Sequence, residues 1–380
     1  MHYLDDVRAG GSLRVGQLLA NNLPPDEVES RILFAYGNKG PVGEQSTVRV
    51  DYAHVKGRWD LGGWLRVRKY ITEFKPDILH FQDPLVVCRI FLSGLPGRRL
   101  THCHGRPLNP PTTRAQKFNA WWLKRDTDLF VCIDAVAAQT LEKFNLARKG
   151  QCVLLANGVD FEWLQQRPTR TGARNALSLP ADKKIMGMVC RVVEHKGIPD
   201  LFRQLKFLPD EWHGAIFGDG PDRDKLQAQA RQLNLSDRIH FVGALNDVRS
   251  AYAAMDAYFF ACAHEPFGLV LAEAMACDVP VFGLHGLGEY RQHHPPLIDE
   301  SVAILLERGN VARLHDPKQA AIPEADEIYQ TLARKIADYG EDDEISRRMI
   351  AAARERVRGH FDIHTRAAKL MKIYRDILSR

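Results

Sequence analysis

The sequence contains no long hydrophobic run. No stretch approaches the ~20 apolar residues that cross a membrane, and Met1 to Asp6 lack the basic and apolar regions of a signal peptide. Hydrophobic residues nevertheless make up 45% of the 380 residues and charged residues 26%, which is typical of a globular protein with an ample core. We therefore expect a cytoplasmic protein.

Disulfide and metal motifs are also missing. The seven cysteines form no C-x-x-C pair and mostly occupy apolar runs, so we interpret them as reduced thiols. Asp126 and Asp128 form a D-x-D pair, but its position before the strand-like run 129–133 favours a cap and turn over a metal site. His102 and His104 share one face of a strand without a third ligand, and we interpret His102 as a structural hydrogen-bonding residue. We expect no metal and no cofactor.

The dinucleotide fingerprint is incomplete. Phe217-Gly-Asp-Gly220-Pro221 supplies G-x-G, but Arg223 occupies the third glycine position, which argues against a dehydrogenase. No nucleic-acid recognition module is present and the net charge is only +5, so nucleic acid is not an expected partner.

The sequence does contain a doubled alternation of strand-like and helix-like segments. The strand-like runs are residues 32–36, 78–81, 98–104 and 129–133 in the first half and 185–190, 213–217, 239–242, 257–261 and 279–282 in the second. Such alternation predicts parallel sheets covered by helices, and its doubling predicts two α/β domains. We place these domains at 1–165 and 166–360, with 361–380 as a last helix and residues 165–175 as the best candidate for the linker.

Positive charge is concentrated in the first half. Residues 1–165 hold 22 Lys and Arg against 17 Asp and Glu, whereas the remainder is balanced. The segment from Lys56 to Lys69 interleaves basic residues with Trp59 and Trp64, a combination that suits an anionic membrane surface or an acceptor carrying phosphate. A packed helix with a basic outer face explains the same pattern.

The most informative stretch runs from Phe260 to Ala276. An apolar run ends at a turn with Glu265, and Gly268 then opens a segment rich in Leu and Ala whose composition favours helix. A helix that begins there directs unpaired N–H groups at the turn and can bind an anion such as diphosphate. Eight helical positions would separate Glu265 from Glu273 by about 12 Å, too far for a glycosidase pair. The spacing suits two carboxylates that hold opposite ends of a long ligand.

Other candidate site residues follow strand-like runs. Arg191 and Lys196 come after 185–190, where two cations can bind a diphosphate, although an exposed basic loop is the alternative. Gly10 and Gly11 separate the first strand from a helix and allow a ligand to approach the backbone. His104 stands at a strand end, where open parallel sheets place their ligands.

The order of these motifs resembles a retaining glycosyltransferase of the GT-B fold, family 4, over the whole chain. The motifs are Gly10-Gly11, His104-Gly105, Asn157-Gly-Val-Asp160, Arg191 to Gly197, Gly218-Asp-Gly-Pro221 and Glu265-x7-Glu273. The resemblance implies two Rossmann-like domains that face each other across a cleft, with the C-terminal helix crossing back to the first. It implies an acceptor-binding first domain and a second domain that binds a nucleotide sugar.

The resemblance also implies roles for single residues. Arg191 and Lys196 would neutralise the donor diphosphate, whose charge grows as the glycosidic bond breaks. Glu273 would bind the ribose. The sugar would be held by Glu265 with the backbone of Phe267, Gly268 and Leu269. The amides of Gly10 and Gly11 would approach the diphosphate or the sugar, and His104 would lie near the reacting face of the sugar. Transfer would retain the anomeric configuration without a metal, and we favour a positioning role for Glu265 over a nucleophilic one.

The resemblance is incomplete in places. Cys190 stands where the family often has a glycine before the arginine, and the loop after Pro280 reads Gly286-Leu-Gly-Glu289 in place of a Gly-Gly loop.

The expected reaction moves a hexosyl unit from a UDP- or GDP-sugar to a sugar or lipid-linked acceptor in surface polysaccharide or lipopolysaccharide synthesis, on the inner face of the membrane. The alternatives are a GT-B epimerase and a non-catalytic nucleotide-sugar-binding protein.

Overall fold

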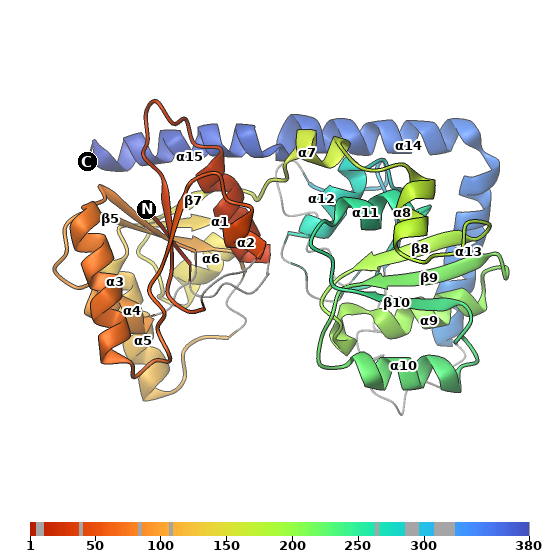
Figure 1. Cartoon of the computed structure of the whole chain (residues 1–380), viewed down its shortest axis with the longest axis horizontal. Helices are drawn as coiled ribbons and strands as arrows, with labels where there is room; N and C mark the ends of the chain where they lie inside the picture. Colours follow the sequence, from red (N-terminus) through yellow and green to blue (C-terminus); the bar gives the residue numbers. More distant parts are fainter. Residues whose placement is uncertain are drawn as a thin grey trace. The chain divides into compact units, whose positions relative to one another are not determined.

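The protein is described here by a computed structural model that covers residues 1–4, 11–37, 41–82, 86–105, 109–262, 265, 267–285, 296–307 and 324–379. The chain divides into two compact units (Figure 1). Unit 1 comprises Met1–Asp160 together with Phe361–Arg380, and unit 2 comprises Phe161–His360. Each unit is an α/β domain with its own sheet, and each is described separately below.

Unit 1 contains a parallel sheet in which seven strands are described, in the order β3-β2-β1-β4-β5-β6-β7. The strands are β1 (His2–Leu4), β2 (Arg31–Phe34), β3 (Arg49–Tyr52), β4 (Ile78–Phe81), β5 (Arg98–Cys103), β6 (Leu129–Cys132) and β7 (Cys152–Leu154). The short apolar runs of β2, β4, β5 and β6 are mostly buried, as expected for a parallel sheet covered on both faces, whereas the outer strands β3 and β7 are partly exposed. The strand order reverses between β1 and β4, the point at which such sheets bind ligands.

The helices of unit 1 begin at recognisable caps. Thr113 and Gln116 form a capping box at the start of α5, and the carboxylates of Asp60 and Asp134 cap α3 and α6. The helices are α1 (Gly11–Asn21), α2 (Pro41–Glu44), α3 (Leu61–Phe74), α4 (Val86–Phe91), α5 (Arg114–Asp126), α6 (Ala135–Lys143) and α15 (Ile363–Leu378).

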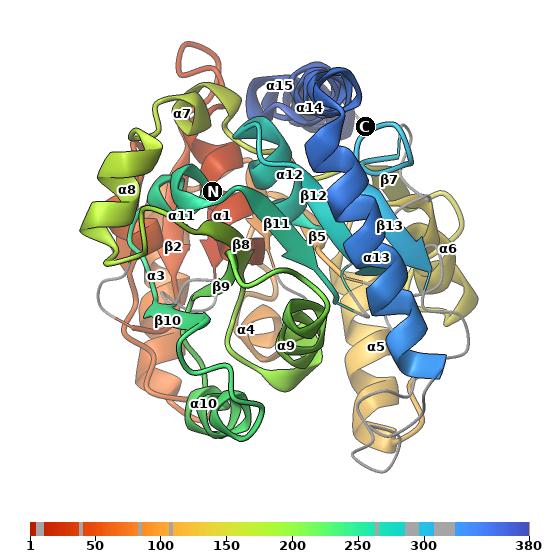
Figure 2. The ribbon, with the colours of Figure 1, turned by 90° about the vertical axis from the view of Figure 1, so that its right-hand side faces the viewer.

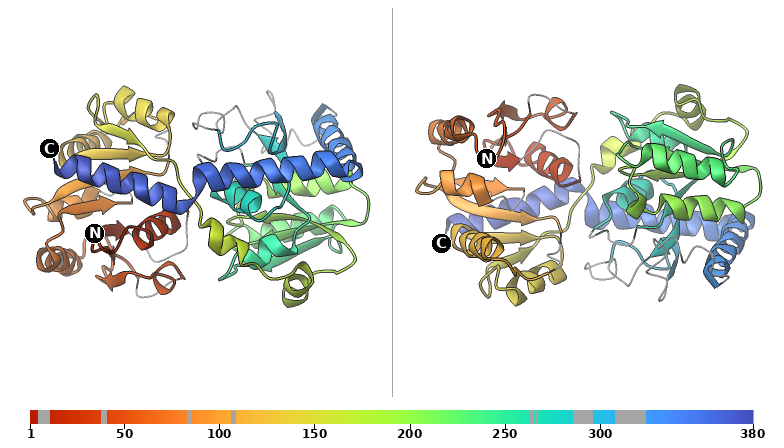
Figure 3. Two further views of the ribbon diagram at one scale, coloured as in Figure 1. Left: turned by 90° about the horizontal axis from the view of Figure 1, so that it is seen from above. Right: turned by 90° about the horizontal axis from the view of Figure 1, so that it is seen from below.

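The C-terminal helix α15 belongs to unit 1 although it is last in the sequence. It contacts α1, and Figure 3 shows it along the unit 1 sheet. The Asn157-Gly-Val-Asp160 motif attaches its start, because Val159 exchanges backbone hydrogen bonds of 2.9 Å with Phe361 and Ile363. A Cβ on Gly158 would lie 3.0 Å from the Phe361 carbonyl oxygen, which makes a side chain difficult to accommodate there.

Unit 2 contains a second parallel sheet, with six described strands in the order β10-β9-β8-β11-β12-β13. The strands are β8 (Lys184–Val189), β9 (Trp212–Phe217), β10 (Ile239–Gly243), β11 (Ala257–Phe260), β12 (Val281–His285) and β13 (Ile304–Glu307). The helical segments are α7 (Phe161–Gln165), α8 (Arg170–Ala176), the 3-10 turn η1 (Glu194–Lys196), α9 (Ile198–Lys206), α10 (Arg223–Gln232), α11 (Arg249–Ala254), α12 (Leu269–Ala276), α13 (Glu324–Glu341) and α14 (Asp343–Arg356), followed by a π-helical turn at Val357–Phe361.

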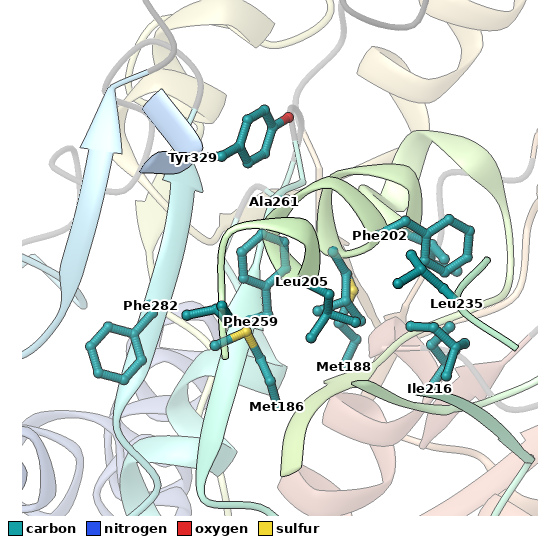
Figure 4. Packing of buried hydrophobic residues seen from close by; sticks show 14 of the residues in the cluster. Met186, Met188, Phe202, Leu205, Ile216, Leu235, Phe259, Ala261, Phe282 and Tyr329 are labelled. Atoms are coloured by element: carbon teal, nitrogen blue, oxygen red, sulfur yellow. The ribbon is translucent and has the colours of Figure 1, made fainter. Parts of the chain in front are cut away.

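The core of unit 2 lies between this sheet and its helices. Figure 2 shows α9 and α13 on one side of the sheet and α11 and α12 on the other. Figure 4 shows Phe259 and Phe282 of the sheet in one buried cluster with Phe202 of α9 and Tyr329 of α13. The two wound parallel sheets and the returning C-terminal helix confirm the predicted fold class.

The linker prediction for residues 165–175 was wrong. Most of this stretch forms helix α8, whose first turn is capped by the Thr169 hydroxyl. Arg174 is buried, and its guanidinium donates to the carbonyl oxygens of Ala254, Ala181 and Lys183 and to the Asp256 carboxylate. The polar residues that resemble a linker in the sequence therefore anchor a helix to unit 2.

Candidate active site

In unit 2 the sheet reverses its strand order between β8 and β11, and two candidate residues meet there. Lys196 lies in the turn η1 after β8, and Glu265 follows β11. The Lys196 Nζ lies 2.8 Å from Glu265 Oε2, and the side chains are 26% and 21% exposed. Burial has the largest single effect and lowers the pKa of the Lys196 ammonium, but the charge and hydrogen bond of Glu265, together with the nearby thiols of Cys262 and Cys190, outweigh it and raise the pKa above its ordinary value. The lysine is therefore held in its charged form.

Glycines bring the strand-end loops of unit 2 into close contact. Gly197 has φ +85°, and a Cβ on it would lie 2.6 Å from the Ala261 carbonyl oxygen. Gly218 has φ +147°, and its Cβ would lie 1.9 Å from the Cys190 carbonyl oxygen. The G-x-G at 218–220 therefore packs the β9 loop against the loop that carries Arg191, a role that differs from dinucleotide binding.

Helix α12 begins beside Glu265. Gly268 is its N-cap with φ +84°, and within the described chain no side chain caps the first turn. Leu269 is the first helical residue, and the Phe267 side chain is buried beneath the turn. The first N–H groups of the eight-residue helix α12 therefore supply partial positive charge beside Glu265.

Glu273 lies one turn further along α12 and is held by a tyrosine of α11. Tyr252 donates its hydroxyl hydrogen to Glu273 Oε2 at 2.6 Å. Burial, together with the carboxylate charge, raises the pKa of Tyr252 well above its ordinary value, so the phenol stays protonated. Tyr252 could not be recognised from the sequence, because a buried tyrosine in an apolar helix gives no signal before its partner is known.

Arg191 is close in sequence to Lys196 but differs in its surroundings. It follows β8, its side chain is exposed, and no ion pair of it is found among the described residues. The intervening Glu194 is bound elsewhere, because its carboxylate lies 2.5 Å from Lys225 Nζ. The structure therefore brings Lys196, Glu265 and the start of α12 together and leaves Arg191 on an exposed loop.

His104 belongs to unit 1, where it directly follows β5 and ends a row of stacked imidazoles. Its ring stacks on that of His102 with centroids 4.1 Å apart, and His102 stacks on His80 at 5.3 Å. Burial lowers the pKa of His104 to about 4, an effect that the Asn157 side chain partly offsets. His104 is therefore neutral at physiological pH.

His102 does not have the hydrogen-bonding role that the sequence predicted. Both of its ring nitrogens are buried, and neither has a hydrogen-bond partner among the residues that the structure describes. Its stacking contacts explain its position instead. His80 of β4 lies opposite Leu100, His102 follows two residues further along β5, and its ring stacks between those of His80 and His104.

The other glycine and aspartate predictions have separate outcomes. Gly10 lies outside the described residues, and Gly11 opens α1 as an exposed residue. Asp126 is the last residue of α5, and its carboxylate binds the guanidinium groups of Arg89 and Arg99. In the described part of the chain, no group of three or more His, Cys, Asp and Glu residues is placed to hold a metal ion.

The basic and aromatic segment from Lys56 to Lys69 divides into a buried and an exposed set. Trp64 is fully buried and its indole donates to the Arg58 carbonyl oxygen at 3.1 Å, so the prediction that it contributes to a membrane contact was wrong. Trp59 is 81% exposed, and Leu65 is exposed on α3. None of the described helices has the length and apolar composition needed to cross a bilayer.

Two wound α/β units, with a cation and a carboxylate at the switch point of the second, define a protein of the GT-B class. Family models identify the branch: "Glycosyltransferase Family 4" matches residues 9–163 and "Glycosyl transferases group 1" matches residues 169–290. The chain belongs to glycosyltransferase family 4.

Individual relatives agree with this placement. The chain is 30% identical over 191 residues to the 2-deoxystreptamine N-acetyl-D-glucosaminyltransferase of Streptomyces fradiae, covering 46% of this chain and 44% of that protein. It is 25% identical over 282 residues to the lipopolysaccharide core biosynthesis glycosyltransferase LpsD of Rhizobium meliloti, covering 73% of this chain and 76% of LpsD. Anabaena HepE, solved with UDP-glucose, has a TM-score of 0.79 at 20% identity and covers 99% of this chain and 98% of HepE, which shows the shared fold.

Proposed function

We propose that the protein transfers a hexosyl unit from a UDP-sugar to a sugar or lipid-linked sugar acceptor, with retention of the anomeric configuration and without a metal. The observation that carries the proposal is the Lys196–Glu265 pair beside the start of α12. HepE, which has the same fold, was solved with UDP-glucose, and LpsD acts in lipopolysaccharide core biosynthesis. We infer a similar donor and a surface-polysaccharide acceptor for this chain.

Unit 2 is the proposed donor-binding domain. The donor diphosphate binds between Lys196 and the free N–H groups of α12, and the exposed Arg191 closes on it as a second cation. Negative charge on the leaving diphosphate grows as the glycosidic bond breaks, so these groups stabilise the transition state more than the ground state. Lys196 is already charged and partly desolvated, which reduces the reorganisation that the reaction requires.

Carboxylates hold the groups on either side of the diphosphate in this proposal. Glu273, oriented by Tyr252, accepts hydrogen bonds from the ribose hydroxyls. Glu265, with the backbone of Phe267, Gly268 and Leu269, binds hydroxyls of the sugar. We assign Glu265 a positioning role, because its salt bridge to Lys196 ties it to the diphosphate site. The leaving diphosphate then assists deprotonation of the acceptor hydroxyl.

Unit 1 is the proposed acceptor-binding domain. In this proposal His104 lies near the sugar, and the amides of Gly10 and Gly11 approach the sugar or the diphosphate.

We also propose a peripheral contact with an anionic inner membrane surface. It uses Lys56, Trp59 and Leu65, which are exposed within one ten-residue segment. Sedimentation with phosphatidylglycerol vesicles should show weaker binding for Trp59→Ala and unchanged binding for Trp121→Ala, which removes another exposed tryptophan. Equal loss in both variants would contradict the assigned surface.

The donor proposal is tested by thermal unfolding with a series of nucleotide sugars. A ligand that binds the folded state raises Tm by mass action, and a concentration of 100 Kd stabilises by about 2.7 kcal/mol. We expect UDP-sugars to raise Tm more than GDP- or ADP-sugars, and Lys196→Ala to abolish the increase. Product analysis with and without acceptor separates transfer from epimerisation. If none of the nucleotide sugars in the series raises Tm, the proposal is refuted.

A further inference from the structure

A groove on the surface of unit 1 is lined by positive charge. It lies between helix α5 and the end of helix α6, and its volume of about 600 Å³ is typical of a ligand-binding pocket. Its walls carry five cations, which are Lys117, Lys124, Arg125, Lys143 and Arg148. All five belong to unit 1, whereas the Lys196–Glu265 pair belongs to unit 2.

The cations of the groove have no counter-charge in the part of the chain that the structure describes. None of the five forms an ion pair there, and no described carboxylate lines the groove. The sequence explains this imbalance, because residues 109–125 hold four Lys and Arg, residues 143–149 hold three, and neither stretch contains Asp or Glu. The Asp126 carboxylate binds two buried arginines, and the Glu142 carboxylate accepts a backbone hydrogen bond. A hollow lined by one sign of charge concentrates ligands of the opposite sign, so the groove suits an anion.

Aromatic rings lie among these cations. Trp121 of α5 is 53% exposed, and its ring contacts those of Phe118 and Trp122 with centroids 6.1 and 5.8 Å away. The Arg125 guanidinium lies 5.7 Å from the Trp121 centroid, and Phe144 lines the groove beside them. An indole of this kind offers a flat apolar surface to the C–H groups of a sugar ring, while neighbouring cations can bind acidic groups of the same molecule.

The two walls of the groove are fixed to each other. Lys124 Nζ lies 2.5 Å from Asn145 Oδ1, and Leu123 of α5 belongs to one buried cluster with apolar residues of α6. From Lys117 to Arg125 the α5 wall extends about 12 Å, at a rise of 1.5 Å per residue. A preformed wall of this length with a cation near each end suits an elongated ligand better than a single small anion.

We propose that this groove binds an acidic oligosaccharide, a short glycan segment that carries carboxylate or phosphate groups. The cations of both walls bind the acidic groups, and Trp121 packs against a sugar ring. The affinity for anions is a property of unit 1 alone. The choice of a glycan rests on the proposed function, to which it adds that the acceptor is acidic.

Two other anionic partners match the groove less well. A membrane surface is contacted by apolar side chains that project into it, whereas these cations surround a hollow. A single-stranded nucleic acid stacks successive bases on several aromatic side chains. Among the described residues that line the groove, Trp121 is the only exposed aromatic side chain.

Isothermal calorimetry on the full chain, without a nucleotide sugar, tests the proposal. The probes are tetragalacturonate, which carries carboxylates, mannopentaose phosphate, which carries a phosphate, and maltotetraose, which is neutral. We expect at least one acidic probe to bind, maltotetraose to bind about ten-fold more weakly or less, and the acidic probe to weaken as salt is added. If neither acidic probe binds, or if maltotetraose binds equally well, the proposal is overturned.

Matched variants locate the binding site. Arg148→Ala removes a cation of the groove, and Lys149→Ala removes the next cation in the sequence, which is exposed and does not line the groove. We expect the Kd of the acidic probe to rise about ten-fold in Arg148→Ala, which corresponds to about 1.4 kcal/mol, and less than about two-fold in Lys149→Ala. Equal losses in the two variants would assign binding to net charge and overturn the groove.

A second pair of variants tests the aromatic contact. Trp121→Ala should raise the Kd of the acidic probe about five-fold, because the sugar ring loses its apolar surface. Trp59→Ala, which removes an exposed tryptophan outside the groove, should leave the Kd unchanged. Equal effects of the two variants would refute the assigned contact.

Further probes separate the partners and the two proposals. If oligouridylate or phosphatidylglycerol vesicles depend on Arg148 while the acidic oligosaccharides do not, the groove has another partner and the proposal fails. If an acidic oligosaccharide binds while no nucleotide sugar raises Tm, the groove stands and the proposed function fails. If a nucleotide sugar raises Tm while no acidic oligosaccharide binds, the groove proposal fails and the donor proposal stands.

Discussion

The two units carry different kinds of side chain at the equivalent position of their parallel sheets, where the strand order reverses. In unit 2 the strand order reverses between β8 and β11, and the loops there carry a charged lysine and glutamate. In unit 1 it reverses between β1 and β4, and the groups there are neutral imidazoles, together with the Gln82 amide and the Tyr374 phenol that hydrogen-bond to them. The fold determines where a ligand can bind, and the side chains determine which chemical groups are bound.

Burial explains why each set is suited to a different ligand. Lys196 and Glu265 keep about a quarter of their surface in water and neutralise each other, so the cation remains charged at a tolerable desolvation cost. His2 and His80 are almost completely buried, with no counter-charge among the residues that the structure describes, so they remain neutral. The first arrangement suits a diphosphate, and the second suits hydroxyl groups.

The largest expected effect is the loss of the unit 2 cation. Lys196→Ala should lower kcat/KM about 10²- to 10³-fold, as for removal of one preorganised group that stabilises developing negative charge. The fold should persist, because the partly exposed pair contributes little to stability. Steady-state kinetics with far-UV circular dichroism measure both quantities. Lys225→Ala removes an exposed lysine that binds Glu194 and should retain near-normal activity; an equal loss there would mean that net charge matters and position does not.

A smaller but still large effect is expected where the unit 2 loops touch. Gly218→Ala introduces a Cβ that the Cys190 carbonyl oxygen excludes, at a φ that is unfavourable for alanine. We expect a loss of about 2–3 kcal/mol in the free energy of unfolding, from strain and displaced backbone. Gly340→Ala is the control, since no atom of the described chain lies within 4 Å of the Cβ it would carry and the residue is helical. It should be neutral or stabilising by up to about 1 kcal/mol; urea unfolding that ranks the two variants equally would contradict the contact.

The strand and helix pattern was predictable from the sequence because it depends on local periodicity. The strand-like runs matched β-strands in both units, and Gly268 opened α12 as predicted. The stretch 165–175 was misassigned because its polar composition resembles a linker, whereas Arg174 is buried and donates to the Ala254 carbonyl oxygen and the Asp256 carboxylate, 80 and 82 residues away in the sequence. Such long-range hydrogen bonds leave no local signal.

The site was predictable only in part for a similar reason. The pairing of Lys196 with Glu265 agrees with strand-end positions in adjacent strands, which sequence can indicate. Gln82, Tyr252 and Tyr374 contribute through contacts across 21 to 372 residues of sequence, and nothing in their immediate neighbours marks them. Trp64 and Trp59 show the same limit, since the first is buried and the second is exposed although both are flanked by basic residues.

The buried histidines of unit 1, which are His2, His80, His102 and His104, predict that the stability of this unit decreases in acid. The folded-state pKa of each of its histidines is lowered, so the unfolded state binds more protons below the ordinary value of 6.5. Stability is therefore complete above about pH 6.5 and decreases as the pH falls, by at most about 1.4 kcal/mol per pH unit for each histidine. The contribution of His104 to this loss is complete near pH 4, where the folded protein also binds the proton.

Urea unfolding between pH 7.5 and 4.5 measures this dependence, and one variant isolates it. His102→Leu removes two buried ring nitrogens that have no partner in the described chain, so it should flatten the pH profile with little loss at pH 7.5. His364→Gln changes an exposed histidine and should leave the profile intact. Parallel profiles for His102→Leu and the natural protein would show that His102 is not a source of the acid sensitivity.

The smallest expected effect concerns the tyrosine that orients Glu273. Tyr252→Phe removes the 2.6 Å hydrogen bond but keeps the ring, so the Glu273 carboxylate retains its charge and loses the hydrogen bond that orients it. One hydrogen bond to a charged group contributes about 1.5–3 kcal/mol. Because water can replace part of this bond at the half-buried Glu273 carboxylate, we expect a net loss of about 1 kcal/mol in binding free energy, which corresponds to an about five-fold rise in the Kd for UDP. Binding of UDP, which has a ribose, should weaken in Tyr252→Phe, whereas binding of inorganic pyrophosphate, which lacks one, should not. Equal weakening for both ligands in isothermal calorimetry would place the effect of Tyr252 at the diphosphate and remove the reason for assigning Glu273 to the ribose.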